Sequence, residues 1–201
     1  MSVQFANPPV RTTDTALDPI FLERWSPRAF DGSPISQADL RTILDAARWA
    51  PSAFNYQPWR FLYSLNGDEH WEEFLSALIP FNQGWAKNAS ALLFIASDTR
   101  SAGPDGVETP LHSHSFDTGA AWAQLALQSH KLGYHTHGMT GIDFDRARDV
   151  LGVPERFRIE AAIAIGRIAP PSVLPEGLRG GEVPSGRKPL EEIAFPGKFI
   201  A

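Results

Sequence analysis

The chain has 201 residues, 43% of them hydrophobic and 20% charged, which indicates one globular domain over 1–201. Its formal net charge of −5 argues against a nucleic-acid partner. No apolar run approaches the ~20 residues that span a bilayer, and Met1–Asn7 lacks the basic start of a secretory signal. The absence of cysteine excludes disulfides, thiolate metal sites and cysteine nucleophiles, and it suits the cytoplasm, where we expect the protein to act.

The first half of the chain predicts helices separated by short loops. Residues 1–17 show no periodicity and are expected to form an N-terminal arm. Asp18 and Pro19 are typical of a helix start, and Ser36 resembles an N-cap with Asp39 three residues later. The pattern predicts helices over 18–24, 36–49 and 68–78, strands over 59–63 and 91–96, and a loop over 80–85.

The second half predicts a long polar loop over 97–114 and then a helix over 115–132. That helix is apolar nearly all round, which indicates burial in a core or at a subunit interface. A short strand and a glycine turn follow over 134–141, then a helix over 143–151. A strand with both faces buried comes next, and the pattern places Ile159, Ala161, Ile163 and Ile165 on one face. The extension 169–201 is rich in proline and glycine, with one helical turn after Lys188.

Alternating cations mark the first candidate site, residues 24–30, which we call the arginine segment. Arg24, Ser26 and Arg28 occupy alternate positions, so in an extended chain their side chains point to one side. The planar fork of arginine suits oxyanions such as phosphate. The segment therefore predicts a site for an anionic cofactor, with a solvated surface loop as the alternative.

A second polar stretch, residues 51–58, follows the second predicted helix, and we call it the 51–58 loop. Ser52, Asn55 and Gln57 place neutral hydrogen-bonding groups beside the aromatic rings of Phe54 and Tyr56. The same residue types favour turns, so ordinary loop capping is the alternative to a binding role.

Several common catalytic motifs are missing, which favours an organic cofactor. G-x-G-x-x-G, G-x-x-x-x-G-K-[ST] and G-x-S-x-G do not occur. A phosphate would have to be held by side chains, and the candidates are Arg24, Arg28, Arg187 and Lys188. Flavin mononucleotide (FMN) fits this inventory, because its phosphate needs cations and its ring needs hydrogen bonds and apolar faces. Gly138 and Gly141 would let the backbone approach the flavin N5 closely.

A metal site is not expected. The pairs that could suggest one are His112/His114, His135/His137 and Asp105/Glu108. No H-x-x-x-H helix and no carboxylate-rich ligand set accompanies them, so packed or surface histidines are the preferred interpretation.

The segments together resemble the nitroreductase family of FMN-dependent oxidoreductases, over about residues 20–195. Residues 24–30 read Arg-Trp-Ser-Pro-Arg-Ala-Phe, similar to the family's R-x-S-x-[RK]-x-[FY] start. Residues 50–59 are similar to its A-P-S-x-x-N-x-Q-P-W segment. Thr140-Gly141 stands where the family often has Glu-Gly, and Ser185-x-Arg187 where it has Lys-x-Arg.

The resemblance implies a set of FMN contacts. The arginine segment would hold the phosphate, ribityl chain and ring edge, and the 51–58 loop would reach the flavin of the other subunit in a homodimer. Asn82 would lie near the pyrimidine edge, Thr140-Gly141 would face N5, and no side chain is implied as a direct catalyst. The implied residues are Arg24, Trp25, Ser26, Arg28, Pro51, Ser52, Ala53, Asn55, Gln57, Asn82, Thr140, Gly141, Arg187 and Lys188.

The implied fold is α+β, with a mixed or antiparallel central sheet flanked by helices and extended termini that wrap a dimer partner. The implied activity is reduction of nitroaromatics, quinones or similar electron-poor substrates by NADH or NADPH, in a ping-pong hydride transfer. Candidates to line the substrate side, with core packing as the alternative for each, are Phe54, Trp85, His112, His114 and Phe116.

Two other functions stay open from the sequence. One is a flavin-binding protein with little reductase turnover, acting as a carrier, sensor or flavin-consuming enzyme. The other is an interaction domain without flavin that dimerises through the 115–132 helix. The physiological substrate, the choice between NADH and NADPH, and the role of the 97–114 loop are left open.

Overall fold

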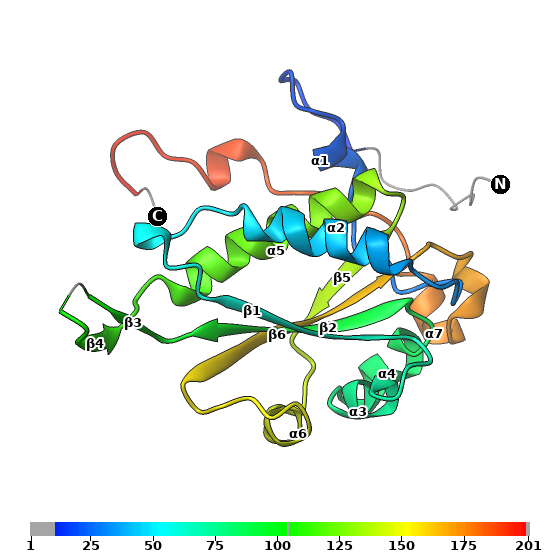
Figure 1. Ribbon diagram of the computed structural model, residues 1–201. Helices are drawn as coiled ribbons and strands as arrows, with labels where there is room; N and C mark the ends of the chain where they lie inside the picture. The colour runs from blue at the N-terminus through cyan, green and yellow to red at the C-terminus, as the bar shows by residue number, and fades with distance from the viewer. Residues whose placement is uncertain (1–10, 104, 200–201) are drawn as a thin grey trace.

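The computed structural model describes residues 11–103 and 105–199 of the chain. Its central sheet is antiparallel throughout and has the strand order β1-β2-β6-β5 (Figure 1). The strands are β1 Trp59–Leu65, β2 Ala91–Asp98, β5 His135–Met139 and β6 Phe157–Gly166. The predicted α+β class is confirmed. Residues 1–10 of the predicted arm lie outside the described residues.

Helices cover both faces of this sheet (Figure 1). One face carries α2 Gln37–Arg48 and α5 His114–Lys131, and the other carries α3 Trp71–Ser76, α4 Pro80–Ala86 and α6 Phe144–Val150. The remaining short elements are α1 Ile20–Glu23, α7 Glu176–Arg179 and the 3-10 turns Ala53–Asn55, Pro171–Val173 and Leu190–Glu192. No helix among the described residues is long and apolar enough to cross a membrane.

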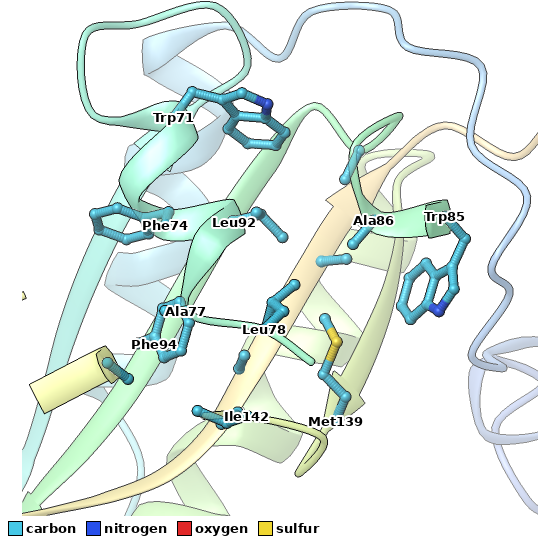
Figure 2. Packing of buried hydrophobic residues seen from close by; sticks show 14 of the residues in the cluster. Trp71, Phe74, Ala77, Leu78, Trp85, Ala86, Leu92, Phe94, Met139 and Ile142 are labelled. Carbon is cyan, nitrogen blue, oxygen red and sulfur yellow. The ribbon is translucent and has the colours of Figure 1, made fainter. Parts of the chain in front are cut away.

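The central strand β2 supplies both cores. All its residues are buried, with Leu92 and Phe94 in one core and Leu93 and Ile95 in the other. Figure 2 shows the first core, where Phe74 of α3 packs against Phe94 and the α4 residues Trp85 and Ala86 lie to one side. Burial of each such side chain contributes about 1.5–3 kcal/mol, so one strand anchors the helices of both layers.

The predicted helix starts are confirmed at two positions. Ser36 Oγ accepts the Asp39 N–H at 3.0 Å, which caps α2. An oxygen of Asp18 accepts the Ile20 N–H at 3.0 Å at the start of α1. The helix expected over 68–78 is shorter, because the Asp68 carboxylate accepts the N–H groups of Leu65 and His70 and forms a turn before α3 begins.

The loop expected over 80–85 is wrong, since residues 80–86 form α4. Pro80 occupies the first helical position, where its missing N–H costs nothing. Trp85 and Ala86 are buried against the sheet, and this tertiary packing outweighs the low helix propensity of Gly84.

The long loop expected over 97–114 is also wrong. β2 continues to Asp98, and β3 Arg100–Ala102 then pairs with β4 Glu108–Pro110 in a hairpin. The turn between them uses Gly106 at a φ of 74°, a conformation that glycine adopts without strain. β3 and β4 have three residues each, which is too few to show a clear strand period in the sequence.

The predicted face of Ile159 is wrong, because β6 contains a β-bulge. Ile95 pairs with Ala161 but Ala96 pairs with Ile159, so Glu160 is an extra residue in β6. Ile159 therefore lies in the core beneath the sheet with Phe94, whereas Ile163 and Ile165 lie in the opposite core. Alternate residues of a regular strand share a face, but the extra residue at the bulge moves Ile159 to the face opposite Ile163.

Candidate functional site

The arginine segment alternates in burial, as the sequence predicts. Trp25, Pro27 and Ala29 are buried and alternate with the partly exposed Arg24, Ser26 and Arg28, and the segment ends on the buried Phe30. The buried side faces β5. The Pro27 carbonyl oxygen lies 3.0 Å from Nδ1 of His137, and the Trp25 ring meets the His135 ring nearly edge-on. The polar side chains are thus held together on the open side.

Guanidinium groups from both ends of the chain gather at this segment. Arg11 donates to the carbonyl oxygens of Ser185, Leu22 and Arg24 at distances from 2.8 to 3.0 Å. Burial, and then the charges of Arg11 and Arg187, lower the pKa of Arg24. Burial and the charge of Arg187 lower the pKa of Arg11. No carboxylate of the described chain pairs with these three groups.

This arrangement fits a bound phosphate. Like charges held together raise the free energy of the folded protein, and an anion between them would lower it. Arg28 adds a buried Nε that has no hydrogen-bond partner among the described residues. Lys188, next to Arg187, is exposed. Arg11 was not predicted, because it belongs to a segment without periodicity or motif.

A buried carboxylate holds the backbone of the arginine segment. Glu182 is 1% exposed, and its Oε1 accepts the N–H groups of Arg28 at 2.6 Å and Ala29 at 2.7 Å. Such charge-assisted bonds are roughly twice as strong as neutral ones. Glu182 thus positions Arg28 from the C-terminal extension. No sequence motif identifies Glu182, because its partners are backbone groups.

A line of contacts joins the arginine segment to the turn at 140–141. The centres of the His137 and Trp85 rings lie 4.8 Å apart. Trp85 Nε1 donates to Asn82 Oδ1 at 3.3 Å. Asn82 Nδ2 donates to the Gly141 carbonyl oxygen at 3.0 Å. A Cβ at Gly141 would collide with the Asn82 side chain, so the position requires glycine. The structure thus brings together Asn82 and Gly141, with Thr140 exposed beside them.

The 51–58 loop has an unusual backbone. Phe54, Asn55 and Gln57 have positive φ angles of 48°, 58° and 49°. Such conformations cost about 1–3 kcal/mol each in non-glycine residues and cluster at functional sites. Ser52 Oγ accepts the Gln57 N–H at 3.0 Å and closes the loop. Phe54 is left 91% exposed.

Asp117 supports this loop from the first turns of α5. Its side chain is buried, and Oδ2 accepts the Ala53 N–H at 3.1 Å and the Ser113 hydroxyl at 2.8 Å. Asp117 was not predicted, although an acidic residue in an otherwise apolar helix is a signal that could have marked it.

The predicted site residues therefore form two groups that lie far apart in one chain. Glu23, which precedes Arg24, lies 3.5 Å from His130 near the end of α5, whereas Ala53 bonds to Asp117 near its beginning. These helix positions are separated by thirteen residues, about 20 Å along the axis, and Figure 1 shows the two regions at opposite ends of α5. The arginine segment, Asn82, Gly141 and Arg187 form one group, and the 51–58 loop forms the other.

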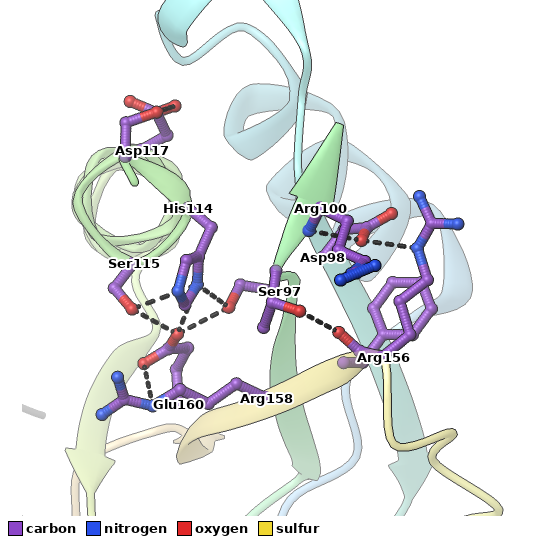
Figure 3. Close-up of polar contacts among 12 residues, drawn as sticks. Ser97, Asp98, Arg100, His114, Ser115, Asp117, Arg156, Arg158 and Glu160 are labelled. Atoms are coloured by element: carbon purple, nitrogen blue, oxygen red, sulfur yellow. Dashed lines mark hydrogen bonds and ion pairs between the residues drawn. The ribbon is translucent and has the colours of Figure 1, made fainter. Parts of the chain in front are cut away.

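The residues expected on the substrate side divide between surface and core. Phe54 is 91% and Phe116 is 83% exposed, whereas Trp85 is 1% exposed and packs in the core, in agreement with the core-packing alternative. His114 Nδ1 lies 2.7 Å from Ser97 Oγ (Figure 3). Glu160, displaced by the bulge, accepts hydrogen bonds from the hydroxyls of Ser97 and Ser115. His114 therefore helps to join the start of α5 to the sheet.

Comparison with known proteins places the chain in a family. The model of the nitroreductase family matches residues 22–79 and 65–167. The chain belongs to the nitroreductase family. The family predicted from the motifs is confirmed, and with it an oxidoreductase with the expected α+β fold.

Relatives of this nitroreductase-family chain carry several names. An oxidoreductase containing FMN, known from its crystal structure, is 51% identical with a TM-score of 0.92, and the match covers 98% of this chain and 99% of that one. A CLA biosynthesis enone reductase of Lactiplantibacillus plantarum is 29% identical, over 75% of this chain and 84% of that protein. An NADH dehydrogenase of Thermus thermophilus is 29% identical, over 87% and 92%.

Replacing Glu182 with alanine should lower the free energy of unfolding by about 2–4 kcal/mol, because two backbone N–H groups lose a charged acceptor. Glu182→Gln keeps an acceptor and should cost less. Urea denaturation measures both. Glu176→Ala, an exposed residue of the same extension, should change stability by no more than about 0.5 kcal/mol. Equal stability of Glu182→Ala and the wild type would contradict the assigned positioning role.

Stability should fall as the pH is lowered from 6.5 to 4. Burial, and then the charges of His130 and Arg24, lower the pKa of His135 from 6.5 to about 4. Between these values the unfolded chain binds a proton that the folded chain does not, so acid favours unfolding, by on the order of 3 kcal/mol across the window. His135→Gln should flatten this part of the profile, and His112→Gln, at an exposed position, should not. Identical profiles for His135→Gln and the wild type would contradict the assignment.

Proposed function

We propose that this chain is an FMN-dependent oxidoreductase that takes electrons from NADH or NADPH and reduces nitroaromatics, quinones or activated alkenes. The observation that carries the proposal is the group of Arg11, Arg24 and Arg187, gathered without a carboxylate partner in the described chain. The 51% identity to an oxidoreductase containing FMN supports the cofactor. Relatives named NADH dehydrogenase and enone reductase support the donor and the class of acceptor.

The residues of this chain would divide the work of holding FMN. Arg24, Arg28 and Arg187, joined by Arg11, bind and neutralise the phosphate. Asn82 and the turn at 140–141 lie at the other end of the contact line and suit the polar edge of the ring. When bound, FMN supplies hydride acceptance from the donor and hydride return to the acceptor in alternating half-reactions. The protein's part is to bind, to orient and to neutralise charge.

We further propose that two copies of the chain share each site. The 51–58 loop is strained and supported by Asp117, yet it lies about 20 Å from the arginine segment of its own chain. A second copy can bring its loop to that segment. Exposed apolar side chains suit such an interface, and they include Trp49, Phe54, Phe116, Leu190 and Ile193. A nicotinamide donor and a cysteine-free chain suit action in the reducing cytoplasm.

The purified protein should be yellow, and NADH or NADPH should bleach its flavin absorption over many turnovers with a quinone. Arg24→Ala should weaken FMN binding by about 1.5–3 kcal/mol, because a charge-assisted bond to phosphate is lost. Arg146→Ala, on α6 beneath the sheet, should bind FMN normally. Quenching of FMN fluorescence measures the affinities. A colourless protein that takes up no FMN would reject the function, and normal affinity in Arg24→Ala would reject the site.

Mixing two impaired variants should restore activity if the site is shared. Arg24→Ala damages one half of each site and Asn55→Ala the other, so a mixed dimer contains one site with both changes and one with neither. Random exchange of subunits should then recover about a quarter of wild-type activity.

Arg24→Ala mixed with Arg28→Ala is the matched control for this complementation. Both changes lie in the same half, so every site in the mixed dimer keeps one defect and no activity returns. Equal results for the two mixtures, or a monomeric mass with FMN bound, would contradict the shared site.

A further inference from the structure

The base of the β3–β4 hairpin carries a recess outside the proposed FMN site. The hairpin lies beside the start of β1, and the recess between them has a volume of about 180 Å³. A second, shallower recess of about 500 Å³ adjoins it, and the two share Arg100 and Leu111 in their walls. The hairpin was not predicted, and the sequence left the role of the 97–114 region open, with His112 and His114 as candidates for the substrate side.

The first recess has an excess of positive charge. Arg60, Arg100 and Arg156 line it together with Asp98. Arg156 is already paired, because its Nε lies 2.7 Å from Asp98 (Figure 3) and its Nη1 lies 2.6 Å from Glu108. Arg156 thus pairs with two carboxylates, and the three guanidinium groups outnumber these two acids by one positive charge. This is notable on a chain whose net charge is −5.

Arg100 has the most available guanidinium. Its backbone N–H donates to Asp98 Oδ1 at 3.1 Å, which fixes the start of β3, but its side chain makes no hydrogen bond or ion pair within the described ranges. Arg60 is held in place, because Nη1 donates to the Gln57 carbonyl oxygen at 3.1 Å and the guanidinium lies 5.6 Å from the Phe157 ring centre. Two forked cations thus face one recess, one of them already oriented.

The position of the recess connects it with the proposed active site. Tyr56 and Pro58 form part of its wall, and both belong to the 51–58 loop. Arg60 bonds to Gln57 in the same loop. The exposed ring of Phe54 lies beside this wall, with its centre 5.7 Å from the centre of the Tyr56 ring. A ligand that lies along Phe54 and Tyr56 could therefore place a charged end between Arg60 and Arg100.

We propose that this recess binds the oxyanion of a ligand of the enzyme, with Arg100 as the specificity-determining contact. The shared chemistry is a carboxylate or phosphate joined to a flat apolar body, because forked cations and apolar side chains line the same recess. Its source is either a carboxylate on the electron acceptor or a phosphate of the nicotinamide dinucleotide. The inference rests on the proposed function.

Equilibrium binding to the oxidised holoenzyme, without electron donor, separates the two sources without turnover. 4-Nitrobenzoate and nitrobenzene differ by one carboxylate, and NADP⁺ and NAD⁺ differ by one phosphate. Arg100→Gln should raise the Kd of 4-nitrobenzoate, or that of NADP⁺, about fivefold or more, and leave nitrobenzene unchanged. Arg100→Lys, which keeps the charge, should recover most of the loss. Arg146→Gln should leave every Kd unchanged.

The outcomes separate this inference from the function on which it rests. A loss confined to 4-nitrobenzoate assigns the recess to the acceptor, and a loss confined to the nucleotides assigns it to the donor. A yellow, reducible Arg100→Gln protein that binds all four ligands as the wild type does would overturn the recess alone. A colourless wild-type protein would overturn the proposed function and the recess together.

Discussion

Holding several guanidinium groups side by side is the constraint on which this structure depends. Burial, and then the charges of neighbouring guanidinium groups, lower the pKa of Arg24 and the pKa of Arg11, so the chain must fix these groups by other means. Arg11 is held by backbone carbonyl oxygens. The segment that bears Arg24 and Arg28 is held by burial of its alternate residues and by Glu182. Both termini are therefore attached to the sheet where positive charge is gathered.

The long helix α5 sets the distance between the two parts of the site. Its first turns hold the 51–58 loop through Asp117, and its last turn lies against α1 through His130 and Glu23. A rigid helix keeps these points about 20 Å apart, and no loop rearrangement within one chain would join them. The exposed Phe116 and Ala123 leave one side of α5 uncovered. The helix predicted to be apolar nearly all round buries one face on α2 and the sheet and leaves the other face exposed.

The sequence could predict what depends on local pattern. The alternation of Arg24, Ser26 and Arg28 and the cap at Ser36 need only neighbouring residues, and both are seen in the structure. Tertiary packing and pairing decided the elements that the sequence missed. α4 forms because Trp85 is buried despite Gly84, and the bulge at Glu160 reverses the face of Ile159. Arg11, Glu182 and Asp117 bind backbone groups distant in sequence, so their own positions carried little or no signal.

The same contacts imply that cofactor binding and the order of the termini are coupled. Arg11 joins the N-terminal arm to the carbonyl oxygen of Ser185, and Glu182 of the C-terminal extension bonds to the arginine segment. An anion placed among the guanidinium groups removes the repulsion that opposes this arrangement. A ligand that binds only the arranged state stabilises that state by mass action. In the proposed site, Arg11 and the C-terminal extension would therefore act twice, because they would supply cations and would become more stable when the anion is bound.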